Sequence, residues 1–132
     1  PQRLASITVG DYPAAQIAPP HEVIPKLQAN IRFGRPITDR VPAPIVAKVI
    51  EAAHTEWYYD DLSRVSVPLM VIHGLGRSGM VKEQAMEAYR NARPDTHFVP
   101  VDDGHDLWRR DPSAVPRALE EFLERVDSTA PG

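Results

Sequence analysis

The sequence contains no cysteine, and its charges are nearly balanced. Without cysteine the chain has no disulfide framework, no thiolate metal site and no thiol nucleophile. Its 132 residues carry a net charge of only −3, which does not support a strongly basic surface for nucleic acid. No apolar run approaches the roughly 20 residues needed to cross a bilayer. We therefore expect a cytoplasmic protein with no signal peptide and no membrane partner.

Proline is abundant, by contrast, and most of the 14 prolines precede residue 70. Because proline fixes φ and lacks an N–H, long regular elements are not expected in the early, proline-rich part of the chain. Short helices are predicted over 21–33 and, from apolar residues at helical spacing, over 44–58. This part of the chain is typical of an excursion from a sheet.

The rest of the pattern alternates between strands and helices. Apolar runs bounded by turn residues predict buried strands over 4–10, 68–74 and 96–101. Helical periodicity predicts helices over 83–92 and from about 111 to 126, the second capped by Asp111 with Pro112 in its first turn. Strands separated by helices imply a parallel α/β sheet.

His105 is the leading candidate for chemistry. It follows Gly104 in a loop just after the last predicted strand, at the sheet edge where ligand and catalytic groups gather. An imidazole there can act as a general base near neutral pH. The alternative interpretation is an ordinary surface histidine.

Four motifs, by their residues and their order along the chain, resemble the C-terminal part of the α/β-hydrolase superfamily. VPLMVIHG resembles the strand of that family that ends in HG, and the GH of the DDGHD loop resembles the loop of the catalytic histidine. DPSAVPRALEEFL is similar to the last helix, and PQRLASITVGDYPA is similar to the entry to the sixth strand. The resemblance implies an α/β fold: the C-terminal portion of an α/β-hydrolase parallel sheet with a small helical cap insertion.

By this resemblance 1–14 forms a core strand segment, 15–60 a cap or lid, 61–127 the C-terminal core and 128–132 a tail. Three strands are fewer than the family's eight, and the G-x-S-x-G run that supplies the nucleophile does not occur. We therefore expect a nicked, split or truncated hydrolase, completed by an N-terminal segment or a partner chain.

The resemblance implies that His105 is the catalytic histidine. The family's usual acid position, three residues after Gly74, holds Arg77, which cannot accept a hydrogen bond from an imidazole. Some members carry the acid at the end of the sixth strand, which matches Asp11. We therefore expect Asp11 to accept a hydrogen bond from the His105 ring; the alternative is a turn aspartate with only local bonds.

Aromatic side chains are the candidate substrate-binding residues: Tyr12, Trp57, Tyr58 and Trp108. Those of the insertion can equally pack the cap onto the sheet. The expected reaction is hydrolysis of a small ester, lactone or similar acyl substrate, without cofactor or metal. An aspartate nucleophile would instead cleave epoxides or carbon–halogen bonds.

Other interpretations remain open. With Arg77 at the usual acid position, the chain could be a degenerate, non-catalytic binding protein of the same fold. Arg77 and Ser78 lie where a substrate carboxylate or phosphate could be bound, although a salt bridge or an ordinary surface loop is favoured. His73 is expected to be a packed core residue. A minor alternative makes Pro1 a catalytic N-terminal amine, as in tautomerases.

Overall fold

The computed structural model describes residues 4–20, 22, 25–26, 29–32 and 34–129, and so not Pro1. The chain forms two compact units. One combines Pro1–Ala14 with Tyr58–Gly132, and the other is Ala15–Trp57. That the insertion predicted over 15–60 acts as a cap stays a prediction.

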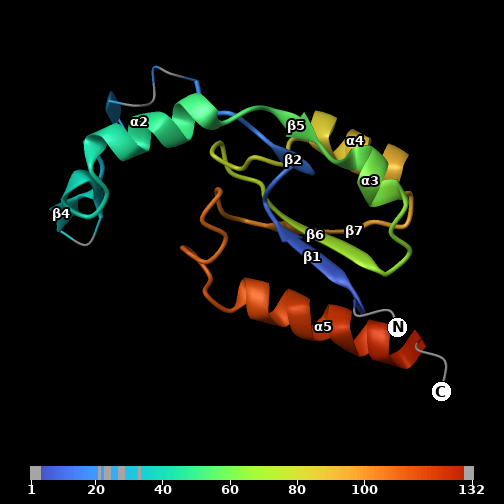
Figure 1. Cartoon of the computed structure of the whole chain (residues 1–132). Helices are drawn as coiled ribbons and strands as arrows, with labels where there is room; N and C mark the ends of the chain where they lie inside the picture. Colours follow the sequence, from blue (N-terminus) through green and yellow to red (C-terminus); the bar gives the residue numbers. More distant parts are fainter. Residues whose placement is uncertain (1–3, 21, 23–24, 27–28, 33, 130–132) are drawn as a thin grey trace. The chain divides into compact units, whose positions relative to one another are not determined.

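The first unit is built on a parallel sheet of three strands, in the order β1–β6–β7 (Figure 1). The strands are β1 (Ile7–Gly10), β6 (Leu69–Gly74) and β7 (His97–Val101). Val71 of β6 pairs with Val9 on one side and with Phe98 on the other. Every residue of β6 is buried, because strands flank it and helices cover both faces, which explains its unbroken apolar run. The predicted α/β class with a parallel sheet is confirmed.

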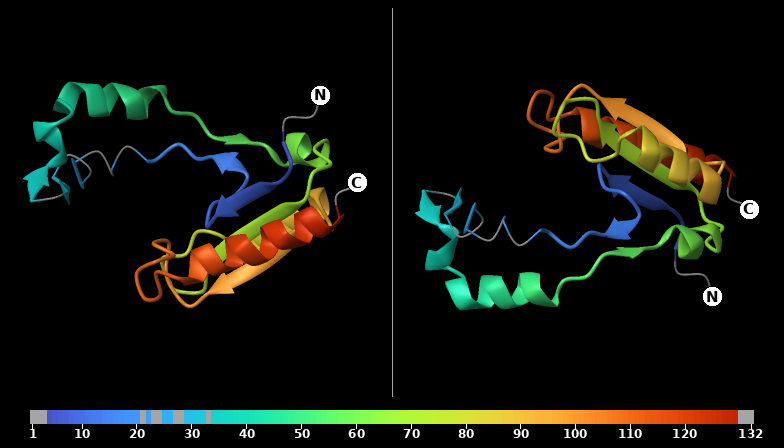
Figure 2. Two further views of the ribbon diagram at one scale, coloured as in Figure 1. Left: turned by 90° about the horizontal axis from the view of Figure 1, so that it is seen from below. Right: turned by 90° about the horizontal axis from the view of Figure 1, so that it is seen from above.

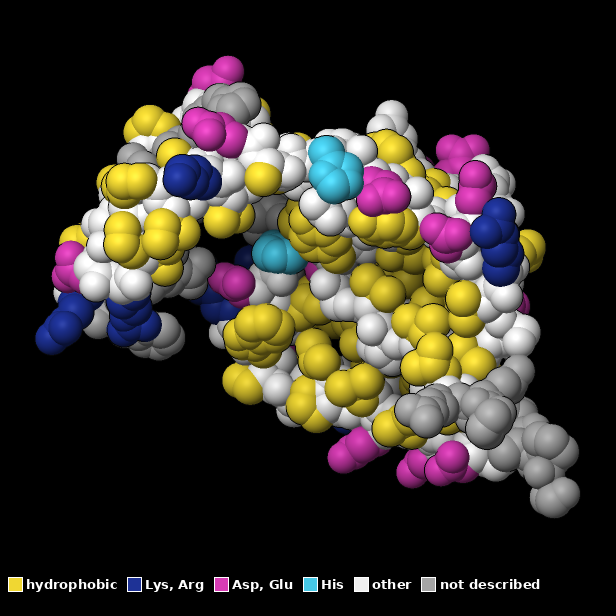
Figure 3. Space-filling model, in the orientation of Figure 1, with side chains coloured by type: hydrophobic (Ala, Val, Ile, Leu, Met, Phe, Trp, Pro, Cys, Tyr) yellow, Lys and Arg dark blue, Asp and Glu magenta, His cyan; other side chains and the backbone are white. Residues whose placement is uncertain are grey.

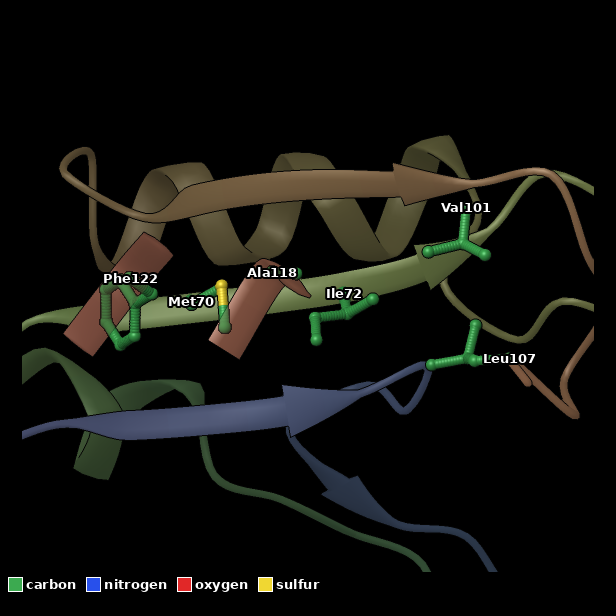
Figure 4. Close-up of a cluster of buried hydrophobic side chains, with 6 residues drawn as sticks. All are labelled: Met70, Ile72, Val101, Leu107, Ala118 and Phe122. Atoms are coloured by element: carbon green, nitrogen blue, oxygen red, sulfur yellow. The ribbon is translucent and has the colours of Figure 1, made fainter. Parts of the chain in front are cut away.

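One face of the sheet packs on α5 (Ala114–Thr129). The buried cluster on this face, drawn in Figure 4, consists of Met70, Ile72, Val101, Leu107, Ala118 and Phe122. Met70 and Ile72 share this face because alternate residues of a strand point to the same side. Leu107 is only 2% exposed, so it anchors the loop that carries His105 to the core.

The opposite face is covered by α3 (Tyr59–Ser63) and α4 (Glu83–Ala92), as the views in Figure 2 show. Its buried cluster consists of Leu69, Val71, Val81 and Tyr89. The ring of Tyr89 makes edge contacts with Tyr59 and Phe98, with centroids 5.3 and 6.2 Å away. The first unit is therefore a three-layer arrangement of helix, sheet and helix.

The helices of this unit follow their predictions closely. α4 spans the predicted 83–92. α5 begins at Ala114, and the Asp111 carboxylate accepts the N–H of Ser113 at 2.9 Å, as a cap does. α5 continues to Thr129, so residues 128–129, predicted as tail, are helical.

The second unit departs further from its prediction. α2 (Ala43–Ala52) ends well before 58, because Ala53 turns to an extended conformation with ψ 138°. Residues Glu56–Trp57 instead form β5, which pairs antiparallel with β2 (Ala15–Gln16). The helix predicted over 44–58 is therefore confirmed as far as Ala52, and its extension to Tyr58 was wrong.

The helix predicted over 21–33 is wrong at its end and lies partly outside the described residues. Ile31–Arg32 forms β3, which pairs with β4 (Arg35–Pro36), ahead of the short helix η2 (Ile37–Asp39). Gly34, between the two strands, has a φ of 75°, a left-handed conformation that glycine adopts without strain. A glycine turn therefore replaces the predicted helix end.

Truncating the core should destabilise the sheet unit. Ile72→Ala removes a side chain that is 1% exposed on the central strand, so the free energy of unfolding should fall by about 2–5 kcal/mol in urea titration. Leu123→Ala, on α5 but 48% exposed, should change it by less than about 0.5 kcal/mol. Equal losses for the two variants would contradict the packing described.

Candidate active site

Asp11 follows β1 directly and has an unusual backbone conformation. Its φ is 44°, in the left-handed region that aspartate tolerates better than most residues. Its N–H donates to the carbonyl oxygen of Ile72 at 2.7 Å, so the chain stays attached to β6 beyond the strand. Its side chain is completely buried at the carboxyl edge of the sheet.

Three backbone N–H groups donate to the Asp11 carboxylate. Those of Gly74 and Val81 reach Oδ1 at 3.0 and 3.3 Å, and that of Met80 reaches Oδ2 at 2.8 Å. Burial raises the pKa of the Asp11 carboxyl, but the donors at Met80 and Gly74, with His105 and Val81, outweigh it and hold that pKa below its ordinary value. The group is therefore a carboxylate at neutral pH despite its burial.

The fourth donor to Asp11 is His105, which follows it by 94 positions. Nδ1 of the ring lies 3.0 Å from Oδ2 of Asp11. Because a carboxylate only accepts, Nδ1 carries the hydrogen and the neutral ring has its free lone pair on Nε2. The His105 side chain is 46% exposed, whereas that of Asp11 is fully buried, so the ring contacts both the buried carboxylate and the solvent. The predicted hydrogen bond is confirmed; the catalytic role of the pair stays a prediction.

Two glycines let the loops of this site approach each other. A Cβ on Gly74 would overlap the carbonyl oxygen of Gly104, and a Cβ on Gly104 would overlap the hydroxyl of Ser78. The His105 N–H also donates to Ser78 Oγ at 3.3 Å. The glycines of the HG and GH motifs therefore allow the loops after β6 and β7 to pack against each other.

Tyr12 is brought next to the Asp11–His105 pair. Its ring centroid lies 6.4 Å from that of His105, and its side chain is partly exposed. The fully buried Tyr89 fixes this turn by donating its hydroxyl to the Tyr12 carbonyl at 2.8 Å. Tyr12 can therefore contact a molecule that reaches His105.

The other predicted substrate-binding residues are distributed differently. Trp108 is 60% exposed, three positions after His105 in the same loop. Tyr58 donates its N–H to the carbonyl of Ala14 at the boundary of the first unit. Trp57 belongs to β5 of the second unit, where it is 60% exposed. Substrate binding by all three stays a prediction.

His73 and Asp103 support the site. His73 is buried at the end of β6 with an edge contact to Phe98, as the core interpretation predicts, and burial lowers its pKa while Asp11 opposes this. Asp103 accepts the N–H groups of Gly104 at 2.8 Å and Arg110 at 2.7 Å. These two hydrogen bonds to the Asp103 carboxylate hold the backbone of the His105 loop in its conformation.

Sequence reasoning missed the N–H donors of Gly74, Met80 and Val81. Backbone donors carry no residue signature, so the only available signal was indirect: a buried carboxylate needs several donors. Within the described ranges no cluster of three histidine, aspartate or glutamate side chains could hold a metal. No helix of those ranges is long and apolar enough to cross a membrane.

The chain was compared with protein-family models and with solved structures. No protein-family model matches the chain, and no solved structure matches it significantly. The α/β architecture is therefore established from the structure alone, and membership of the α/β-hydrolase superfamily stays a prediction from the motifs.

Replacing Asp11 tests its charge. Asp11→Asn keeps a side chain that tolerates positive φ but turns an amide N–H₂ toward existing donors, so the free energy of unfolding at neutral pH should fall by roughly 1–3 kcal/mol. Because the pKa of Asp11 is lower in the folded protein than its ordinary value of 3.8, its ionised carboxylate stabilises the fold fully above that value. This stabilisation is lost as the pH falls through the pKa that Asp11 has in the folded protein. The difference from the wild type should therefore narrow below about pH 4 in urea titrations.

The control is Asp127→Asn, an exposed position on α5, which should change stability by less than about 0.5 kcal/mol. A wild-type advantage that grows below pH 4 would contradict the assigned direction.

Proposed function

We propose that this chain is the C-terminal part of an α/β-hydrolase-type enzyme that cleaves a small ester, lactone or similar acyl substrate. One observation carries the proposal: the buried, ionised Asp11 holds Nδ1 of a half-exposed His105 at 3.0 Å, at the carboxyl edge of a parallel sheet. A carboxylate that orients an imidazole in this way is the acid–base half of a catalytic triad.

In the proposed mechanism His105 acts as the general base. Nε2 takes the proton of a hydroxyl nucleophile as its oxygen attacks the substrate carbonyl carbon, and Asp11 stabilises the imidazolium that forms. The same nitrogen returns the proton to the leaving oxygen when the carbon–oxygen bond breaks. Water then attacks the acyl carbon and loses its proton to Nε2. Nε2 returns this proton to the nucleophile oxygen as the acyl–oxygen bond breaks, so the acid leaves and the enzyme hydroxyl is regenerated.

The nucleophile would come from an additional segment or partner chain that pairs with β1. In the described part of the chain β1 pairs only with β6, so its other edge offers free N–H and C=O groups. Neighbouring parallel strands lie about 5 Å apart and end at the same sheet edge. A residue at the end of such an added strand would therefore lie beside Asp11 and His105.

Exposed apolar side chains support this completion. Leu4 before β1, Leu75 after β6 and Trp108 in the histidine loop are 58%, 61% and 60% exposed. Figure 3 shows hydrophobic side chains gathered over the face of the sheet unit around β1. A surface of this kind is typical of one that another polypeptide covers.

The first experiment tests the pair without a substrate. Ring nitrogen chemical shifts at neutral pH should place the His105 hydrogen on Nδ1 in the wild type. In Asp11→Asn the amide nitrogen should donate to the ring instead, which moves the hydrogen to Nε2. His54, exposed in the second unit, should keep its tautomer in both proteins. An unchanged His105 tautomer would contradict the orienting role of Asp11.

The second experiment tests catalysis in the assembly isolated with the tagged chain, using p-nitrophenyl acetate. His105→Ala should lower kcat about 10³-fold or more, because the nucleophile then lacks its base. His54→Ala is the matched control and should keep full activity.

A wild-type assembly no faster than buffer, or a His105→Ala assembly as fast as the wild type, would refute the hydrolase proposal. Either result would favour the non-catalytic binding protein.

A further inference from the structure

A hollow of about 660 Å³ lies between the loops that follow β6 and β7. One wall comes from Gly76, Arg77 and Ser78, and the other from Asp102, Asp103, Gly104, Arg109 and Arg110. The hollow therefore adjoins the histidine loop on the carboxyl edge of the sheet, where ligands of open α/β sheets bind.

The charges that line the hollow leave an excess of cations. Asp103 is buried and accepts backbone N–H groups of its own loop, and Asp102 pairs with Arg110 at 3.1 Å. Among the described residues no acidic side chain pairs with Arg77 or Arg109, and both are exposed. Two guanidinium groups are thus available to an anion.

The walls of the hollow are held together before any ligand binds. The Gly76 N–H donates to the Asp103 carbonyl at 2.7 Å, and the His105 N–H donates to Ser78 Oγ at 3.3 Å. Lys82 Nζ donates to the carbonyl of Gly76 at 2.8 Å, which holds in place the wall that contains Gly76. A pre-organised site loses little entropy on binding.

We propose that this hollow binds the phosphate group of a small phosphomonoester. A phosphate dianion can pair with both guanidinium groups that lack an acidic partner, and each of them can donate a parallel pair of N–H bonds to two phosphate oxygens. The hydroxyl of Ser78 offers a further donor. This proposal stands on the hollow and its charges alone, and it does not require that the chain be a hydrolase.

The test is titration of the ¹⁵N-labelled chain with inorganic phosphate at constant ionic strength, followed by amide shifts. Saturable shifts are expected at the hollow, for Gly76, Arg77 and Gly104. Arg77→Gln and Arg109→Gln should each raise the Kd about tenfold, and the double variant more. Arg77→Lys should bind with intermediate strength, because it keeps the charge and loses the paired donors.

Arg64→Gln is the matched control, since Arg64 is also exposed but pairs with Asp61 of α3 at 3.3 Å. It should bind phosphate like the wild type, and the same spectra report whether each variant is folded. Shifts that never saturate, or an unchanged Kd in the double variant, would overturn the proposal. Acetate binding as tight as phosphate would overturn the phosphate assignment.

Discussion

The arrangement of the carboxyl edge of the sheet depends on one buried charge, the carboxylate of Asp11. An ion without solvent exposure is stable only if donors replace the lost water. Those donors come from the end of β6, from Met80–Val81 before α4 and from the loop after β7. Solvating Asp11 therefore fixes both ends of the β6–α4 connection and the loop after β7 relative to the end of β1. The orientation of His105 is one consequence.

A second consequence concerns Arg77. In the α/β-hydrolase motifs that the sequence resembles, an acid usually stands at this position, whereas here Asp11 makes the contact with Nδ1 of His105. The loop after β6 then need not carry a carboxylate toward the imidazole, and Arg77 lines the neighbouring hollow instead. With the carboxylate directly after β1, the loop after β6 can carry a cation close to the histidine, a charge that an acidic residue in the same loop would neutralise.

The sequence predicted the elements whose signal is local and strong. β6 and α4 follow from an unbroken apolar run and a clear helical period. The Asp11–His105 contact was expected only from the resemblance to α/β-hydrolase motifs, since some members of that family carry the acid after the sixth strand. The strand pairs β2–β5 and β3–β4 could not be predicted, because two-residue strands show no periodicity. The N–H donors at Met80 and Val81 were equally invisible, since every residue except proline has one.

The two edges of the sheet differ in a way that favours β1 as the side to be extended. β7 contains Pro100, and proline is found in edge strands because it lacks an N–H. The β7 side is therefore suited to remain an edge of the sheet. β1, Ile-Thr-Val-Gly, has neither proline nor charge to prevent a further strand from pairing. Because Asp11 lies at the end of β1, an added strand would deliver its last residue beside the proposed acid–base pair. A strand added at β7 would end two strands further from Asp11, so the β1 edge fits the proposed chemistry better.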